Sequence, residues 1–533
     1  MKIRYILLSL ALGGLAGPPV ARAQKATPPP LANAPRQTAR TELLLDRSDS
    51  EVHVQALPSD STVVLLVGRE QPLSSKSTYS FQQYDQLLHL RQLQQLEVPD
   101  EFNFTRMCAE GNTVYALFTS RSNPGRLWVV AYNGRLGQVR TQQYETRLSR
   151  EVVELKALDG RLFATVLLAD QRHVTALLLD VATGQMQYLA SIYEPLPTQL
   201  TFVADAASRR AEYVLSQTNG RKSRLLLKRL TDKGQLVSSE FVQAESERSL
   251  ITAQLSPPQD TAARLLMGTY SLRDPDYAQG LFATDLRPAT GTGTKSPLRF
   301  YDFLHLKHFF DYLKPRRQAH LRQRTARRIA RSVPPLRWHY RLLLHELLPQ
   351  PNGGYVLVAE VYYPHYRYSS YGNYTGPFNN IGNQFGYGYP GYSNSRIFDG
   401  YQTTHALVCG FDRTGALIWD NIFVVENLRR SELEEAVRLQ TLPDGRLVLA
   451  YLDEAKLRYK LIDRAESAPD DQQVPIQTGT DPTGNTGTEH ASETSQADLL
   501  PWFGSRFVAS GYQRVRVERG PDRQVFFLNS VVF

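Results

Sequence analysis

The chain has 533 residues, 42% of them hydrophobic and 10% aromatic, and only two are cysteines. A chain of this length and composition buries a substantial core without staples, which excludes a disulfide framework as the basis of the fold. The formal net charge is +9, and one region accounts for all of it.

The N-terminus predicts export. Two basic residues precede an apolar run from Tyr5 to Leu15, and Ala21-Arg22-Ala23 supplies a small-x-small cleavage site. We therefore interpret residues 1–23 as a secretory signal peptide and expect a periplasmic or extracellular protein, either soluble or peripheral to the outer membrane. An N-terminal lipid anchor is not expected, because no cysteine lies near the cleavage site. No later run reaches the roughly 18 apolar residues of a transmembrane helix. The Pro-rich residues 24–40 are expected to form a disordered leader.

The stretch from Glu151 to Ile192 has the pattern of four short strands separated by three turns. Two of the turns contain glycine, in Asp159-Gly160 and Thr183-Gly184. Strands of this length bounded by such turns are typical of antiparallel hairpins, and one four-stranded sheet cannot stand alone. We interpret the stretch as one blade of a β-propeller.

Repetition supports this interpretation, because the residue that ends the third strand recurs at intervals of 48, 47, 51, 54, 127 and 51 residues. The seven positions are Asp85, Asn133, Asp180, Thr231, Asp285, Asp412 and Asp463. A period near 50 with four strands per unit predicts an all-β, seven-bladed β-propeller, with six or eight blades as variants. A large β-sandwich or two stacked β domains would be the alternative.

The strand ending followed by Asp-x-x-Gly and an apolar residue, in Leu179–Met186 and Phe411–Leu417, resembles a hairpin of quinoprotein-type and kelch-like propellers. The resemblance implies the fold. It implies no cofactor, because the docking tryptophans of quinoprotein blades are missing. The helical insertion described next also resembles that of exported propellers of envelope-rich bacteria, which implies location and no activity.

The domain boundaries follow from the repeats. We expect blades 1–5 over residues 41–294, a basic helical insertion over 295–348, and blades 6 and 7 over 349–464. Residues 465–498 carry seven acids and no Lys or Arg, and they are expected to form a disordered acidic linker. The C-terminal residues 499–533 should complete the last blade together with strands between Glu42 and Leu57.

The insertion predicts two helices joined at Pro315. The first would bury Phe303, Leu306 and Phe310 on one face. Residues 295–341 hold 13 Lys or Arg against two Asp, a net of +11. Such a patch favours anionic lipid or acidic polysaccharide, and in an exported protein nucleic acid is not expected; the alternative is pairing with the acidic linker. The candidate anion-binding residues are Arg316, Arg317, Arg322, Arg324, Arg327, Arg328 and Arg331.

A Tyr/Gly-rich loop is expected over residues 362–401, with ten tyrosines and seven glycines. Tyrosine offers a flat apolar ring and a hydroxyl, which suits sugar stacking or protein contact, whereas the bland alternative is an insertion with no ligand. The candidate contact residues are Tyr366, Tyr368, Tyr371, Tyr374, Tyr387, Tyr389 and Tyr392.

The sequence contains no motif that assigns a reaction. His345-Glu346 lacks the second histidine of a zinc-protease motif, and His305 with His308 has no carboxylate partner, so no metal or cofactor is predicted. Four acids, Asp159, Asp444, Glu360 and Asp412, would act as glycosidase carboxylates only if the fold brought them together. No catalytic residue is therefore assigned. The two cysteines, Cys108 and Cys409, are expected to be buried free thiols, with a disulfide as the alternative.

Two function classes remain. The first is a non-catalytic binding or scaffold propeller of the cell envelope, with an envelope polysaccharide, a glycolipid or another envelope protein as its partner. The second is a carbohydrate-active enzyme, a glycoside hydrolase or lyase, with its site in the central funnel. A flat or plugged axis would favour the first, and a deep funnel with carboxylates of separated pKa values would favour the second.

Overall fold

The structure is a computed structural model. It describes residues 34–70, 77–146, 149–170, 173–195, 198–205, 209–219, 222–244, 246–257, 264–287, 297–331, 333, 336–368, 396–466, 469, 472–478, 489–517 and 521–533. The predicted signal peptide lies outside these residues. No helix in these ranges is long and apolar enough to cross a membrane.

The described strands form eight antiparallel sheets, each of which is one blade. Blade 1 consists of β2 (Ser50–Leu57), β3 (Thr62–Glu70), β4 (Ser77–Tyr84) and β5 (Leu90–Leu96). Blade 2 consists of β6 (Phe102–Glu110), β7 (Thr113–Ser120), β8 (Arg126–Asn133) and β9 (Gln138–Glu145). Blade 3 consists of β10 (Ser149–Leu158), β11 (Arg161–Leu168), β12 (Val174–Asp180) and β13 (Met186–Tyr188). Blade 4 consists of β14 (Thr198–Asp205), β15 (Arg210–Asn219), β16 (Lys222–Thr231) and β17 (Leu236–Val242).

Blade 5 consists of β18 (Ser249–Leu255), β19 (Leu265–Ser271), β20 (Gly280–Asp285) and β21 (Arg299–Asp302). Blade 6 consists of β22 (Arg341–Leu344), β24 (Tyr355–Tyr368), β25 (Arg396–Phe411) and β26 (Leu417–Arg430), and the short strand β23 (Leu348–Pro349) also pairs with β24. Blade 7 consists of β27 (Arg438–Thr441), β28 (Leu447–Asp453), β29 (Lys456–Ile462) and β30 (Gln472–Pro475). Blade 8 consists of β31 (Glu489–Pro501), β32 (Arg506–Val517), β33 (Arg523–Val532) and β1 (Arg36–Leu43).

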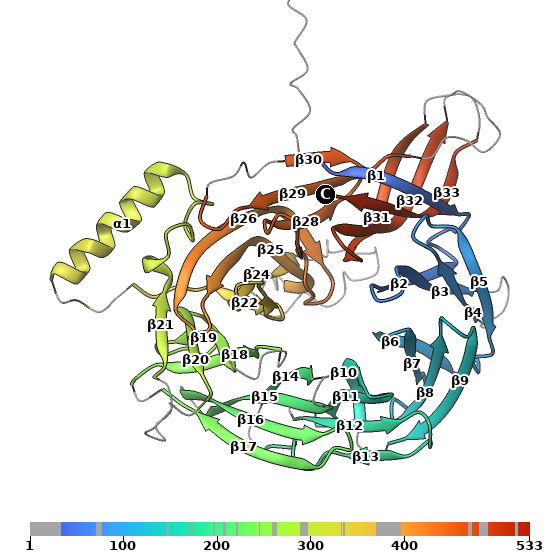
Figure 1. The fold of residues 1–533 in the computed structure, drawn as a ribbon, viewed down its shortest axis with the longest axis horizontal. Coiled ribbons are helices and arrows are strands. Elements are labelled where there is room, and N and C mark those ends of the chain that lie inside the picture. The colour runs from blue at the N-terminus through green and yellow to red at the C-terminus, as the bar shows by residue number, and fades with distance from the viewer. Residues whose placement is uncertain are drawn as a thin grey trace, which may run out of the picture. The chain divides into compact units, whose positions relative to one another are not determined.

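Residues 35–533 arrange these blades in a ring, and the first strand of each blade in this order lies nearest the axis (Figure 1). The all-β propeller prediction is confirmed, but the count of seven blades is wrong. The seven recurrent positions do end, or directly follow, the third strands of blades 1 to 7. Blade 8 has no such position, because its third strand, β33, runs to the C-terminus and its fourth, β1, comes from the other end of the chain.

The pairing of β1 with β33 closes the ring. The register runs from Arg36 opposite Val532 to Leu43 opposite Phe526. Arg523 reinforces the closure through ion pairs with Glu42, at 2.9 Å, and Glu489, at 2.8 Å. The two chain ends therefore share a blade, as predicted, but the N-terminal strand in it is Arg36–Leu43, whereas the second half of the predicted segment, Glu42–Leu57, forms β2 of blade 1. The expected disordered leader, 24–40, is wrong for its last residues, because residues 36–40 belong to β1 and pair with β33, with one register shift between Gln37 and Ala39.

Middle strands are apolar on both sides because each blade packs between two others. In β3 the residues from Thr62 to Gly68 are all buried, whereas the outer strand β5 buries only Leu96. The core is accordingly a series of apolar clusters that join neighbouring blades, such as Leu66, Phe81 and Val114 from blades 1 and 2. Cys108 and Cys409 lie in two different clusters and are both free and buried, as expected.

The insertion differs from the two predicted helices. Only the second forms, as α1 (Pro315–Ala330), and it projects from the rim of the ring (Figure 1). The first predicted helix is instead β21, the short 3-10 helix η1 (Phe303–His305) and an irregular segment. Its backbone N–H groups at Lys307 and His308 donate to the carboxylate of Asp420, at 3.0 and 2.7 Å, rather than to helix carbonyls.

The apolar face predicted for that helix is nevertheless buried. Phe303, Leu306 and Phe310 are each no more than 1% exposed. Phe309 stacks on Phe303 with ring centroids 4.1 Å apart. The apolar spacing therefore predicted correctly that this segment is buried against blades 5 and 6, although the helix that it suggested does not form.

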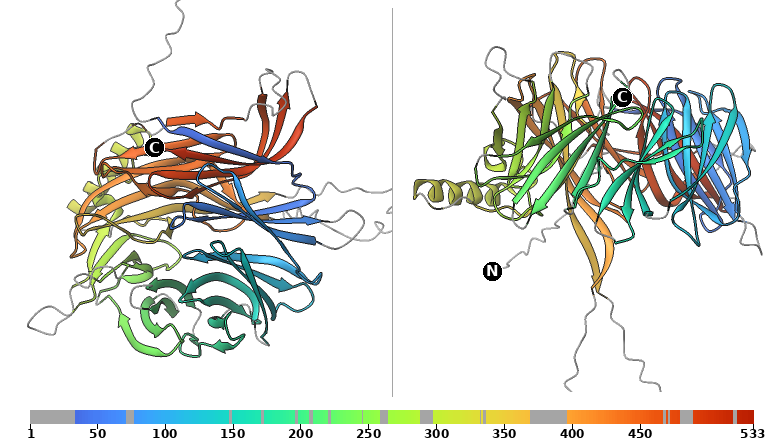
Figure 2. Two further views of the ribbon diagram at one scale, coloured as in Figure 1. Left: turned by 45° about the vertical axis from the view of Figure 1, so that its right-hand side comes forward. Right: turned by 90° about the horizontal axis from the view of Figure 1, so that it is seen from below.

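Two further expected boundaries move. The stretch 465–498, expected to be disordered, contains β30 and the first ten residues of β31, because ladder pairing in blades 7 and 8 satisfies their backbone. The expected loop 362–401 is shorter, since β24 continues to Tyr368 and β25 starts at Arg396. These strand ends project from the ring as a two-stranded ribbon (Figure 2). Residues 369–395 lie outside the described residues.

Candidate functional site

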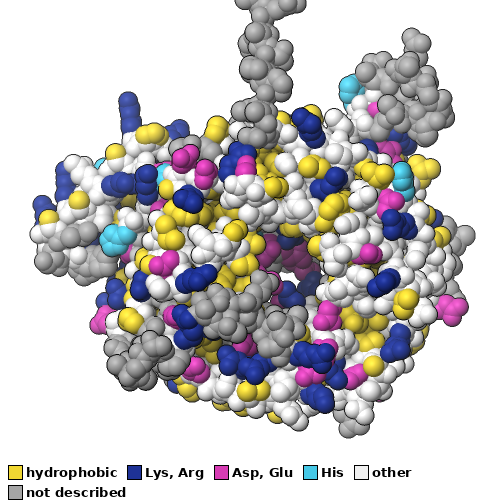
Figure 3. Space-filling view, viewed as in Figure 1, with side chains coloured by type: hydrophobic (Ala, Val, Ile, Leu, Met, Phe, Trp, Pro, Cys, Tyr) yellow, Lys and Arg dark blue, Asp and Glu magenta, His cyan; other side chains and the backbone are white. Residues whose placement is uncertain are grey.

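The axis of the ring is hollow and forms the largest candidate site. A cavity of about 800 Å³ opens there, lined by the innermost strands or adjoining loops of blades 1, 2, 3, 6, 7 and 8. Figure 3 shows acidic and basic side chains on its walls. The axis is therefore neither flat nor plugged by a side-chain core. The charged residues of its lining are Arg106, Glu154, Lys156, His345, Glu346, Glu432, Glu434, Glu435 and Arg438.

Strand β10 supplies part of this set. Glu154 and Lys156 are two residues apart on β10 and both line the cavity, together with Val153 and Leu155. A register shift between Val152 and Glu154 separates them from buried Val152. The Lys156 ammonium pairs with the Glu346 carboxylate at 3.0 Å, across 190 residues of sequence. Sequence reasoning missed these residues, although charged side chains at alternate positions of a blade's first strand were the available signal.

A short acidic loop supplies the opposite wall. The chain leaves β26 at Arg430 and continues as Ser431-Glu432-Leu433-Glu434-Glu435 before β27. Glu432 pairs with Arg106 of blade 2 at 3.1 Å, and Glu435 pairs with Arg438 at 3.1 Å. Three of the cavity's carboxylates, counting Glu346, thus neutralise one cation each.

His345 and Glu360 form a buried pair behind this loop. Their side chains are 7% and 1% exposed, and His345 Nε2 lies 2.8 Å from Glu360 Oε1. That oxygen also accepts the backbone N–H groups of Ala436 and Val437, both at 2.8 Å. On its other side, His345 Nδ1 lies 3.8 Å from the Glu435 carboxylate. The pair therefore anchors the end of the acidic loop to blade 6.

Burial and charge shift several pKa values here. Burial would lower the pKa of His345, but Glu435 and Glu360 outweigh it and raise that pKa. Burial raises the pKa of Glu154 more than Lys156 lowers it, and Glu346 adds to the rise. Burial also opposes the charge of Lys156, yet Glu346 and Glu154 raise its pKa. The cavity therefore holds charged cations and one carboxylate with an increased tendency to keep a proton.

One donor in the cavity has no partner. Arg106 uses one terminal nitrogen for Glu432, but its Nε is buried and makes no hydrogen bond to any described residue. Buried polar groups in folded proteins are nearly always paired.

The four acids considered from the sequence do not converge. Asp159, Asp444 and Asp412 lie in hairpin turns, where each carboxylate is held by neighbouring residues; Asp444, for example, pairs with Arg446 at 2.6 Å. None of the three lines the axial cavity. Glu360 is fully buried behind the cavity. Within the described ranges, no three His, Cys, Asp or Glu side chains come close enough to hold a metal ion.

The arginines predicted on the insertion lie on α1 and beside its end. Arg316, Arg317, Arg322, Arg324, Arg327 and Arg331 are exposed, and Arg328 is half-buried. The helix is anchored through Leu321, which packs on the core cluster of blades 5 and 6, and through Thr325, which is buried. The structure therefore places these charges on the surface, away from the axial cavity.

Of the predicted contact tyrosines, Tyr366 is described with its side chain and is 46% exposed. It packs edge-on against Phe398, with centroids 5.9 Å apart, and Phe398 packs against Tyr401 at 5.1 Å. The row ends at Tyr362, 5.6 Å from Tyr401, so one face of the ribbon carries four aromatic rings. Tyr371, Tyr374, Tyr387, Tyr389, Tyr392 and the side chain of Tyr368 lie outside the described residues.

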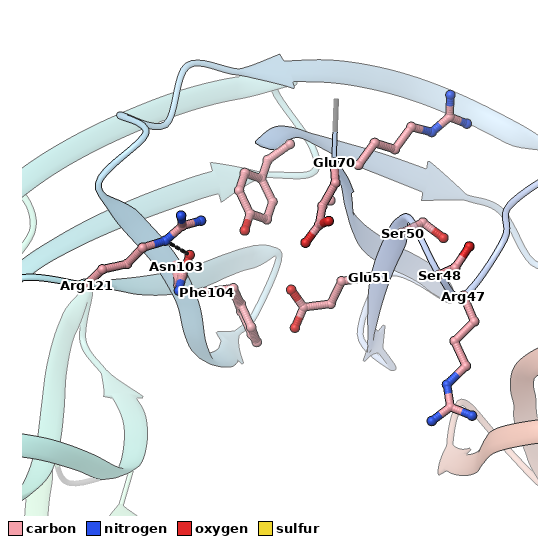
Figure 4. Close-up of a pocket in the computed structure, with 11 residues that line it drawn as sticks. Arg47, Ser48, Ser50, Glu51, Glu70, Asn103, Phe104 and Arg121 are labelled. Carbon is pink, nitrogen blue, oxygen red and sulfur yellow. Dashed lines mark hydrogen bonds between the residues drawn. The ribbon is translucent and has the colours of Figure 1, made fainter. Parts of the chain in front are cut away.

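A smaller hollow of about 320 Å³ lies between blades 1 and 2 (Figure 4). The carboxylates of Glu51 and Glu70 point into it, and Arg121 faces them from the other side, where it donates to Asn103 at 2.7 Å. Burial, followed by the nearby Glu51, raises the pKa of Tyr79, which also lines it. This hollow has less than half the volume of the axial cavity and draws on two blades only, so the axial cavity is the stronger candidate.

No protein-family model matches the sequence, and no curated protein is similar enough to match. Solved structures are similar in fold. The polysaccharide lyase Uly1 has 8% identity and a TM-score of 0.39, over 80% of this chain and 89% of that one. A quinohemoprotein alcohol dehydrogenase from Pseudomonas putida has 10% identity and a TM-score of 0.40, over 93% and 76%. Prolyl oligopeptidase B from Galerina marginata has 8% identity and a TM-score of 0.39, over 89% of this chain and 56% of that longer one.

Proposed function

We propose that this protein is a non-catalytic binding propeller of the cell envelope, and that its axial cavity binds a neutral or amine-bearing oligosaccharide segment. The observation that carries the proposal is Arg106, which lines the cavity and pairs there with Glu432 through one terminal nitrogen. Its side chain is 29% exposed, so its guanidinium group can also donate to a sugar hydroxyl or ring oxygen in the cavity.

The charge balance supports this ligand class. Five carboxylates of the lining stand against Arg106, Lys156 and Arg438, while His345 is matched by buried Glu360. The two remaining carboxylates are Glu154, which tends to keep its proton, and Glu434, which lies 4.0 Å from Arg430. The cavity therefore offers no excess of cations for an acidic sugar and accommodates a neutral or amino sugar. Alternating acceptors and donors on the walls also match hydroxyl groups, each of which both donates and accepts.

The aromatic ribbon supports a sugar chain as well. Tyr366 and Phe398 are each 46% exposed at the projecting end of blade 6. Its base, at Tyr401, is paired with Arg430, directly before the acidic loop of the cavity. Aromatic faces at this place would stack on sugar rings outside the cavity. The envelope location rests on the N-terminal sequence pattern.

The test is a titration of neutral, amino-sugar and uronic-acid oligosaccharides into the mature protein by calorimetry. Neutral or amino-sugar chains should bind, and Arg106→Gln should weaken them by about tenfold through the lost hydrogen bonds. The control is Arg91→Gln, which removes an arginine paired with Asp85 at 3.7 Å on the outer strand of blade 1. Equal affinity of wild type and Arg106→Gln, or preference for uronic acids, would contradict the proposal.

A carbohydrate-active enzyme is the second candidate, and both the hollow axis and the raised pKa of Glu154 favour it. It is placed second because Glu346, the carboxylate beside Glu154, is already paired with Lys156 at 3.0 Å. A carboxyl group that keeps its proton can act as a general acid toward a glycosidic oxygen. Release of reducing ends from the bound polysaccharide, abolished in Glu154→Gln while affinity persists, would establish catalysis. If wild type releases none, the binding function stands.

A further inference from the structure

The C-terminal half of α1 and the turn after it enclose a hollow of about 250 Å³ outside the ring. Its charged lining is entirely basic and consists of His320, Arg324, Arg327, Arg328 and Arg331. Four of these, at positions 320, 324, 327 and 331, are separated by four, three and four residues. This spacing places them on one face of the helix and its extension.

The turn after the helix gives the hollow its shape. The backbone N–H of Arg331 donates to the carbonyl of Arg328 at 3.2 Å, and the N–H of Val333 donates to the same oxygen at 3.0 Å. The chain therefore folds back after Ala330, and Val333 lies against the arginines that line the hollow. This turn therefore bounds the basic face at one end, so that the face is hollowed there.

Intramolecular charges do not balance this face. Among the described residues, no carboxylate lies within ion-pair distance of Arg324, Arg327 or Arg331. The acidic stretch 465–498, which was the alternative partner, pairs elsewhere where it is described. Asp498 contacts Arg430 at 3.1 Å, and Glu489 contacts Arg523 at 2.8 Å.

The helix dipole explains only part of the cluster. Cations in the last turn are stabilised by the dipole. That accounts for Arg327 and Arg328, which are in the last turn. Arg324 and His320 lie one turn or more before it, where this interaction has faded, so the dipole does not account for their place in the cluster.

The helix is held firmly enough to present these groups. Gln318 Nε2 donates to Asp311 Oδ1 at 2.6 Å, and Arg322 donates to the carbonyl of Lys307 at 2.8 Å. Thr325 is 5% exposed, on the side that faces the ring. A ligand would therefore meet these arginines on a helix whose backbone is already held in place.

From these observations we infer that the hollow beside α1 is a binding site for a phosphate group. Guanidinium groups bind phosphate oxygens through paired, charge-assisted hydrogen bonds, and among the described residues no carboxylate competes for Arg324, Arg327 or Arg331. The phosphate can belong to a lipid headgroup or to a soluble molecule. This site is separate from the axial cavity and goes beyond the proposed sugar-binding function.

The first experiment titrates inorganic pyrophosphate into the mature protein by calorimetry at low salt. The variant Arg324→Gln/Arg327→Gln/Arg331→Gln should bind at least about tenfold more weakly, because it removes the converging donors. The control, Lys314→Gln/Arg316→Gln/Arg317→Gln, removes the same charge from the other end of the insertion helix and should stay within about threefold. Thermal unfolding of both variants verifies that they are folded.

Equal weakening in the two variants would overturn the site, since only diffuse attraction would remain. Absence of binding in the wild type would overturn it as well. The second experiment distinguishes the sources of phosphate by flotation with vesicles of phosphatidic acid or of phosphatidylcholine. Retention on phosphatidic acid vesicles that is lost in the Arg324→Gln/Arg327→Gln/Arg331→Gln variant but kept in the control variant identifies a lipid headgroup. Pyrophosphate binding without flotation identifies a soluble phosphate.

Discussion

The axial cavity and helix α1 both gather charged side chains, but they treat charge in opposite ways. In the cavity, Lys156, Arg106 and Arg438 each pair with a glutamate from another strand or loop. On α1, Arg324, Arg327 and Arg331 have no such partner among the described residues. Paired charges hold strands and loops together, whereas unpaired charges on a surface attract a partner.

This difference teaches where substitutions should cost stability and where they should cost only binding. Removing one member of a buried pair leaves a charge that water cannot reach. Removing an exposed arginine leaves no buried charge without a partner. The following predictions test this contrast, from the largest expected loss of stability to the smallest.

The largest effect should follow Glu360→Ala. This change leaves His345 and the N–H groups of Ala436 and Val437 without their shared acceptor, and should lower the free energy of unfolding by about 3–5 kcal/mol. Urea titration followed by circular dichroism measures it. The control is Glu346→Ala, whose side chain is 71% exposed and should cost less than about 1 kcal/mol. Similar losses in both would remove the distinction between buried and open pairs.

Asp420→Ala should have the next largest effect. The Asp420 carboxylate, only 6% exposed as a residue, accepts the backbone N–H groups of Lys307 and His308, and their loss should cost roughly 1–3 kcal/mol. Asp85→Ala also removes two backbone acceptor contacts, to Leu87 and His89, but in an exposed turn where water replaces them. A smaller loss of unfolding free energy in Asp420→Ala than in Asp85→Ala would show that the insertion is not anchored there.

His345→Gln should have a pH-dependent effect. Because Glu435 and Glu360 raise the pKa of His345 in the folded chain, its protonated form is stabilised by folding. That contribution is complete below the unfolded histidine pKa of about 6.5 and is lost as pH rises through the folded pKa. The Tm difference between wild type and His345→Gln should thus be larger at acidic than at alkaline pH. Arg438, which opposes the protonated form, does not reverse this sign.

His89→Gln serves as its control, because the His89 side chain is 74% exposed beside Asp85. It should show nearly the same Tm as wild type across the same pH range. A constant difference between wild type and His345→Gln would mean that His345 is neutral in the fold, and the anchor of the acidic loop would then be an uncharged hydrogen bond.

The smallest effect belongs to the helix. The Arg324→Gln/Arg327→Gln/Arg331→Gln variant should change the free energy of unfolding by no more than about 0.5 kcal/mol, since these side chains are exposed and lack carboxylate partners. Urea titration beside the wild type measures this change. A loss of several kcal/mol would reveal an intramolecular partner and would move α1 into the same class as the cavity.

The sequence by itself determined the local features of this protein. Turn residues at the ends of third strands predicted seven of the eight blades, because a tight hairpin depends on a few neighbouring residues. Apolar spacing likewise predicted that Phe303, Leu306 and Phe310 are buried, and composition predicted the basic helix. These properties depend on contacts and charges within short stretches of chain.

Tertiary structure alone decided the eighth blade and the candidate site. Blade 8 joins β1 to β33, whose paired residues are almost 500 positions apart, so no local period could reveal it. Lys156 meets Glu346 across 190 residues, and Arg106 meets Glu432 across 326. Such contacts depend on ring closure, which brings the first strands of distant blades to one axis regardless of their distance along the chain.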